Sequence, residues 1–95
     1  MSTAVQLTFG DNEYTLRIGQ VTGRQRMKVR EATGVSLMTA LAQLSTSPDL
    51  DTVAVLYYAA AIQAGADPNW NTIIDSVTPE TPIALSLVED EPGEA

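Results

Sequence analysis

Few residues of this chain could support acid–base, nucleophilic or metal chemistry. It contains neither histidine nor cysteine, so it lacks the commonest general base, the commonest metal ligand and the thiolate nucleophile. A Ser-His-Asp or Cys-His arrangement is therefore impossible. The single lysine, Lys28, lies in a basic, polar segment, unlike the desolvated lysines that form Schiff bases. The sequence therefore predicts a protein that is not an enzyme.

Two short motifs are weak candidates for ligand sites. Asp49 and Asp51 could suggest a divalent cation, but no Gly and distal Glu of a calcium loop follow them. Residues 19–23 contain two glycines without the Gly-Lys-Ser/Thr of a phosphate loop. We interpret the first motif as helix capping and the second as a connector. A 95-residue chain also leaves little room for a cleft between two catalytic carboxylates. We expect no cofactor and no metal.

The net charge of −7 is unevenly distributed along the chain. Five bases and two acids give residues 1–30 a charge of +3, whereas ten acids and no base give the remainder −10. A solvated acidic surface explains the acids. The basic cluster instead suggests a helix that contacts a specific partner or a neighbouring copy. Nucleic-acid binding is disfavoured, because the acidic remainder of the chain repels phosphate and a few basic residues make only a small contact surface.

Residues 4–18 predict a β-hairpin. Polar residues alternate with apolar ones on both sides of a turn-forming Gly-Asp-Asn-Glu segment at residues 10–13. The apolar positions are Val5, Leu7, Phe9, Tyr14, Leu16 and Ile18. An isolated hairpin is marginally stable in water, so this one must pack on helices or join another sheet. Either arrangement leaves sheet edges that a partner could use.

Capping signals predict the helices that follow the hairpin. Thr22 and Gly34 delimit a polar, exposed helix, and Ser36 begins a second one with leucines on one face. The third helix is expected to begin with Ser47 as N-cap and Pro48 in its first turn. It ends near Gly65. Its apolar stretch, residues 53–66, is shorter than the roughly 20 residues that cross a membrane, so it indicates a core helix.

Two further helices are expected nearer the C-terminus. Residues 67–69 begin a fourth helix that carries Trp70, and a last helix is expected at residues 83–88. The predicted fold is thus α+β, mostly α: an N-terminal β-hairpin followed by a bundle of four to five short helices. We expect residues 1–88 to form a single domain and residues 89–95 a disordered acidic tail.

The remaining signals concern protein binding. Methionine gives an adaptable apolar contact, and Tyr and Trp combine apolar area with a polar group. Adjacent side chains on a helix point about 100° apart, so one of Tyr57 and Tyr58 is expected to face the core and the other elsewhere. Core packing is the alternative role for Tyr57 and Trp70. The candidate partner-binding residues are Arg24, Arg26, Met27, Lys28, Arg30, Met38, Tyr58 and Trp70.

Four segments occur in a familiar order. LTFGDNEYTLRI at residues 7–18 precedes REATGVSL at 30–37, LDTVAVLYYAAAIQAGADPNW at 50–70 and IIDSV at 73–77. In this order they resemble the small tail assembly chaperones of long-tailed phages and related gene transfer agents, over residues 4–78. The resemblance implies a non-catalytic protein that binds the tape measure protein, keeps it soluble and assists tail tube polymerisation. The tail tube protein and a second copy of the chain are further candidate partners.

Other classes of function stay open at this point. A small virion structural protein, such as a head–tail connector or tail terminator, would form closed rings. A small acidic mimic of DNA would block a host nuclease or repressor, but the basic segment argues against it. Residues 1–9 lack the basic start and apolar segment of a signal peptide. With the resemblance, this predicts the host cell cytoplasm as the place of action and no membrane partner.

Overall fold

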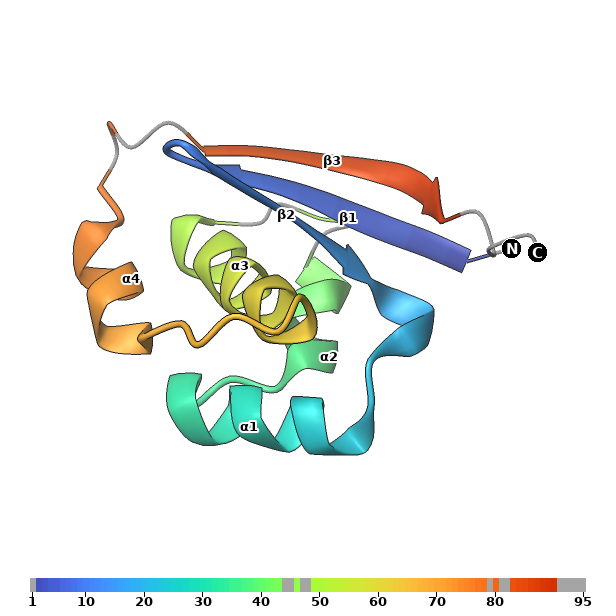
Figure 1. Cartoon of the computed structure of the whole chain (residues 1–95). Coiled ribbons are helices and arrows are strands. Elements are labelled where there is room, and N and C mark those ends of the chain that lie inside the picture. Colours follow the sequence, from blue (N-terminus) through green and yellow to red (C-terminus); the bar gives the residue numbers. More distant parts are fainter. Residues whose placement is uncertain (1, 44–45, 47–48, 79, 81–82, 91–95) are drawn as a thin grey trace.

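A three-stranded antiparallel sheet lies against one side of a group of helices (Figure 1). The structure is a computed structural model and describes residues 2–43, 46, 49–78, 80 and 83–90. Over these residues it confirms the predicted α+β class with predominantly helical content. All helices lie on the same face of the sheet, so its other face is solvated.

The predicted hairpin forms the first two strands. Strand β1 (Ser2–Phe9) and strand β2 (Asn12–Arg17) are joined by a two-residue turn. Gly10 has a φ of 64° there, and Asp11 does not have a positive φ. This is the pattern of a type II′ turn, whose twist matches that of paired strands.

Strand β3 (Ile83–Asp90) corrects the prediction of a last helix at residues 83–88. It pairs antiparallel with the other side of β1, giving the order β2-β1-β3. Leu85 and Leu87 alternate with Ala84 and Ser86, a period of two that suits a strand, and β1 supplies the hydrogen-bonding partner. The strand also takes in two residues that were assigned to the acidic tail. Residues 91–95 lie outside the described part of the chain.

Four α-helices and one 3₁₀ turn make up the rest of the described secondary structure. The first helix has the predicted ends. Thr22 and Gln25 form a reciprocal capping box with bonds of 3.2 and 3.1 Å, and Gly34 ends the helix with a φ of 76°. The elements are η1 (Ile18–Gln20), α1 (Gly23–Thr33), α2 (Leu37–Ala42), α3 (Leu50–Gln63) and α4 (Trp70–Ser76).

Helix α3 begins two residues later than Ser47 and Pro48 would place it. Its N-cap is Asp49, whose carboxylate accepts a 2.8 Å hydrogen bond from the backbone N–H of Thr52. This bond lowers the pKa of Asp49 below its usual value. The expected capping role of Ser47 is therefore wrong, and Ser47 and Pro48 themselves lie outside the described residues.

Helix α3 is the centre of the core. Figure 1 shows it between the sheet on one side and α1 and α2 on the other, with α4 alongside. Its residues from Thr52 to Ala61 are all buried, as expected for a helix that is apolar all round. The Tyr57 ring stacks on Phe9 with centroids 4.7 Å apart and meets the edge of Tyr14 at 5.3 Å. No helix in the described part of the chain is both long and apolar enough to span a membrane.

Candidate protein-binding surface

Helix α1 presents a basic surface to solvent. Val29 is its buried residue and anchors the helix to the core. The four cationic side chains are exposed, and within the described part of the chain none of them has an ion-pair partner. They are Arg24, Arg26, Lys28 and Arg30. Because these charges form no ion pair with the residues that the structure describes, they remain available to an acidic partner.

Two methionines add apolar area to this surface. Met27 on α1 is 65% exposed and Met38 on α2 is 58% exposed. Between α1 and the start of α2 lies an open hollow of about 400 Å³, which we call the α1–α2 groove. Buried Leu37 contributes to its lining, and Arg26 and Arg30 supply its charges. The full lining is Gly23, Arg26, Met27, Arg30, Ser36, Leu37 and Met38.

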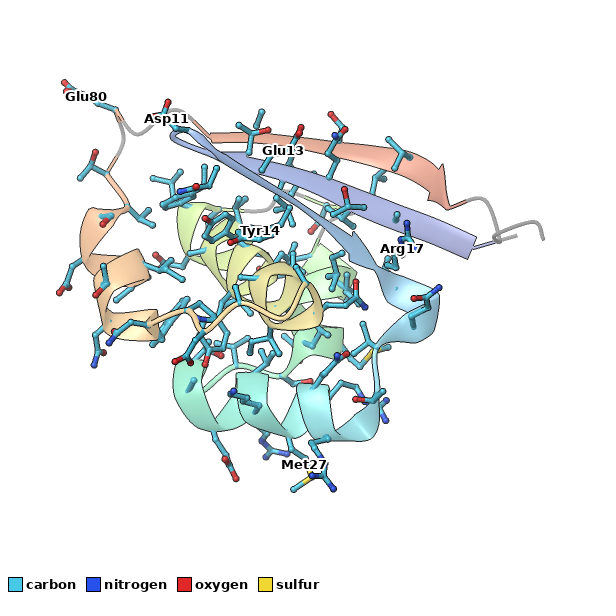
Figure 2. All side chains as sticks on the ribbon, viewed as in Figure 1. Asp11, Glu13, Tyr14, Arg17, Met27 and Glu80 are labelled. Carbon is cyan, nitrogen blue, oxygen red and sulfur yellow. The ribbon has the colours of Figure 1, made fainter. Side chains whose placement is uncertain are left out.

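Met27 also borders a second hollow, on the other side of α1. This one is about 690 Å³ and is lined by Gly23, Arg24, Met27, Lys28 and Glu31. Figure 2 shows Met27 on the side of the molecule away from the sheet, whereas Asp11 and Glu80 lie at the sheet side. The structure thus brings five of the eight predicted binding residues onto α1 and places Met38 beside them. Their shared chemistry is apolar area flanked by positive charge.

Tyr58 and Trp70 do not belong to this surface. Tyr58 was predicted to bind a partner, but it is only 4% exposed and therefore does not lie on the surface of the described structure. Its ring meets the partly buried Trp70 edge-on at 5.8 Å, because α4 packs over this side of α3. Burial raises the pKa of the Tyr58 hydroxyl, and the nearby Asp67 carboxylate adds to the shift. Tyr57 is buried as well, so both adjacent tyrosines lie in the core, and the expectation that one of them points away from it is wrong.

The other hollows offer less to a ligand. The one between the hairpin and α4, lined in part by Tyr14, Tyr57 and Asp67, measures about 260 Å³. Small-molecule sites usually measure about 300–1,000 Å³. No group of three side chains able to hold a metal ion occurs in the described parts of the chain.

One exposed apolar region was missed by the sequence reasoning. Leu87 is 59% exposed and Val88 is 38% exposed, both on strand β3. Interpreting residues 83–88 as a helix hid them, although the period-two alternation was a signal for a strand and hence for a sheet edge.

No protein-family model matches this chain, and neither a curated protein nor a solved structure matches it.

Proposed function

We propose that this protein is a non-catalytic phage tail assembly chaperone that binds the tape measure protein, keeps it soluble and assists tail tube polymerisation. The observation that carries the proposal is the α1–α2 groove, where two exposed methionines lie beside cations that form no ion pair with the described residues. The order of the four sequence segments supports it independently.

The groove fits an amphipathic helix with acidic borders. A helix seats its apolar stripe in a hydrophobic groove, and flexible methionines adapt to varied side chains. Carboxylates beside that stripe would meet Arg26 and Arg30. A tape measure protein is expected to be long and helical, with apolar stripes that aggregate unless they are covered. The net charge of −7 would keep the resulting complex soluble.

The size of the surface favours weak individual contacts. Fully burying a methionine contributes about 1.5–3 kcal/mol, and both methionines are already partly covered, so together they give roughly 2–4 kcal/mol. Exposed ion pairs add about 0.2–1 kcal/mol each. Even with four such pairs, the total does not exceed the roughly 8 kcal/mol of a micromolar complex, and the cost of association lowers it further. Many copies that each bind weakly along one long partner would together cover it. Each copy could still dissociate when tube subunits assemble.

Co-expression with the tape measure protein tests this function. We expect a soluble complex in an affinity pull-down, and we expect the tape measure protein to be insoluble when it is expressed alone. Absence of a complex, with no gain in solubility, would contradict the proposal. Native mass spectrometry of this chain alone addresses the alternative, because a closed ring of fixed size would favour a head–tail connector or tail terminator.

A further inference from the structure

The two edges of the sheet differ in how they are protected. At the β2 edge, the Gln63 side chain from α3 bonds the backbone of Arg17 twice: its Oε1 accepts from Arg17 N–H at 2.7 Å, and its Nε2 donates to Arg17 C=O at 2.9 Å. Strand β2 also carries the charged Glu13 and Arg17. Such contacts and charges prevent another strand from pairing there.

The β3 edge has no comparable protection. Among the described residues, no side chain bonds its outer backbone, and residues 83–88 contain no charge, no proline and no glycine. Figure 1 shows β3 at the border of the sheet, and none of the described helices and strands lies along its outer side. An edge strand whose first six residues carry no charge is a template for another strand.

The apolar face of the sheet is also incomplete at β3. Leu87 is the register partner of Val5 and so shares its face, yet Val5 is fully buried and Leu87 is 59% exposed. Leu85 on the same face is only partly buried. The helices therefore cover the sheet at β1 and leave apolar area open at β3, where a continued sheet would cover it.

We propose that a second copy of this chain pairs its β3 with this edge, antiparallel about a two-fold axis, to form a six-stranded sheet. An antiparallel pair of identical strands is self-complementary, which is what a two-fold interface requires. With Ser86 opposite Ser86 of the second copy, Leu87 faces Leu85 of the second copy on the core side. The β3 strand of each copy then covers the exposed leucine of the other.

The distribution of charge along β3 permits a second copy to pair in this register. Position 89, where the acidic segment begins, lies three residues from the two-fold axis in each copy and on opposite sides of it. The two acidic segments therefore begin about 20 Å apart, at about 3.4 Å per residue. That distance exceeds the screening length of about 8 Å at physiological salt. The centre of the interface is uncharged. Repulsion between the two copies, each of charge −7, therefore acts only over longer distances, and salt weakens this repulsion.

The salt response separates this pairing from the proposed chaperone function. Pairing through β3 buries apolar residues between two acidic molecules, so added salt should tighten it. Binding at the cationic α1–α2 groove should weaken with salt. One strand pair is smaller than the roughly 1,200–2,000 Å² of a stable interface. We therefore expect a dimer that forms at roughly 10–500 µM rather than at nanomolar concentration.

Cross-linking of single-cysteine variants tests the geometry, since the natural chain has no cysteine. Ser86 and Thr15 both flank Gln6 on the solvated face, Ser86 on β3 and Thr15 on β2, so they form a matched pair. Side chains directly opposite in an antiparallel pair have Cβ atoms about 4.5–5.5 Å apart, close enough for a disulfide after a small shift. On mild oxidation, Ser86→Cys should yield at least about ten times more disulfide-linked dimer than Thr15→Cys.

Sedimentation of the full chain gives the second measurement. The mass should rise from 10.1 kDa towards that of a dimer as concentration and salt increase. Leu87→Lys should weaken this association at least about tenfold, because it places a charge on the pairing strand. Met27→Lys, which changes a residue of similar exposure on α1, should leave the association unchanged. A chain that stays monomeric throughout, or equal cross-linking of the two cysteine variants, would overturn the pairing. So would a monomer whose β3 amides become protected only when another protein is added. A natural chain that dimerises but does not bind the tape measure protein would instead count against the proposed function alone.

Discussion

Removing the Gln63 side chain should measurably destabilise the fold. Gln63→Ala deletes two hydrogen bonds, of 2.7 and 2.9 Å, that join the end of α3 to a backbone 46 residues away. A net intramolecular hydrogen bond contributes about 0.5–1.5 kcal/mol, and water can replace part of these solvent-exposed bonds. We therefore expect a loss of about 1–2 kcal/mol in the free energy of unfolding. For a domain of this size, that lowers Tm by roughly 6–12 °C.

Thermal and urea unfolding followed by circular dichroism measures this loss. Gln20→Ala is the matched control, because Gln20 is exposed, lies near the same backbone and has a side chain that makes no hydrogen bond with the described residues. Gln63→Glu retains an acceptor for the Arg17 N–H and loses the donor to its carbonyl, so about half the effect is expected. If the free energy of unfolding of Gln63→Ala lies within about 0.5 kcal/mol of that of the Gln20→Ala control, the two bonds to Arg17 do not stabilise the fold.

Three other perturbations address the core, the cap of α3 and the basic surface. Leu56 is fully buried at the centre of α3, so Leu56→Ala should cost about 2–5 kcal/mol in urea unfolding; a cost below 1 kcal/mol would contradict its central place. The folded-state pKa of Asp49 is depressed, so its contribution to stability is present above its ordinary pKa of 3.8 and is lost as pH falls through the folded value. Asp49→Asn keeps the acceptor without the charge, so its stability should depend less on pH below about 4 than that of the natural chain. Equal acid sensitivity of the two chains would show that Asp49 has no such role. Replacing the four cations of α1 by glutamine should weaken tape measure binding by about 2 kcal/mol, roughly 30-fold, and reduce its salt dependence. Because these side chains are exposed, Tm should stay within about 3 °C; unchanged binding at unchanged circular dichroism would remove α1 from the interface.

The parts of the fold set by local signals could be predicted from the sequence. The hairpin follows from alternating side chains around Gly10 and Asp11, and both ends of α1 follow from Thr22 and Gly34. These features depend on residues a few positions apart, so their chemistry is visible along the chain. The exposure of Met27 was likewise predictable, because it lies in a polar helix with little to bury.

The parts set by distant neighbours could not be predicted. Residues 83–88 form a short apolar run that suits either a helix or a strand, and pairing with β1, about 80 residues earlier, decides the outcome. Tyr58 is buried because α4 returns over α3, which no local pattern near Tyr58 indicates. At the start of α3, Ser47 and Asp49 are both good caps, and sequence alone does not choose between them.

Methyl NMR of the complex with the tape measure protein tests the binding surface most directly. Met27 and Met38 lie on either side of the proposed contact, and their methyl groups report on it without any mutation. We predict that both signals shift or broaden when the tape measure protein is added, and that they return towards their free positions as salt is raised. A complex that forms while both methionine signals stay in place would contradict the α1–α2 groove as the binding site.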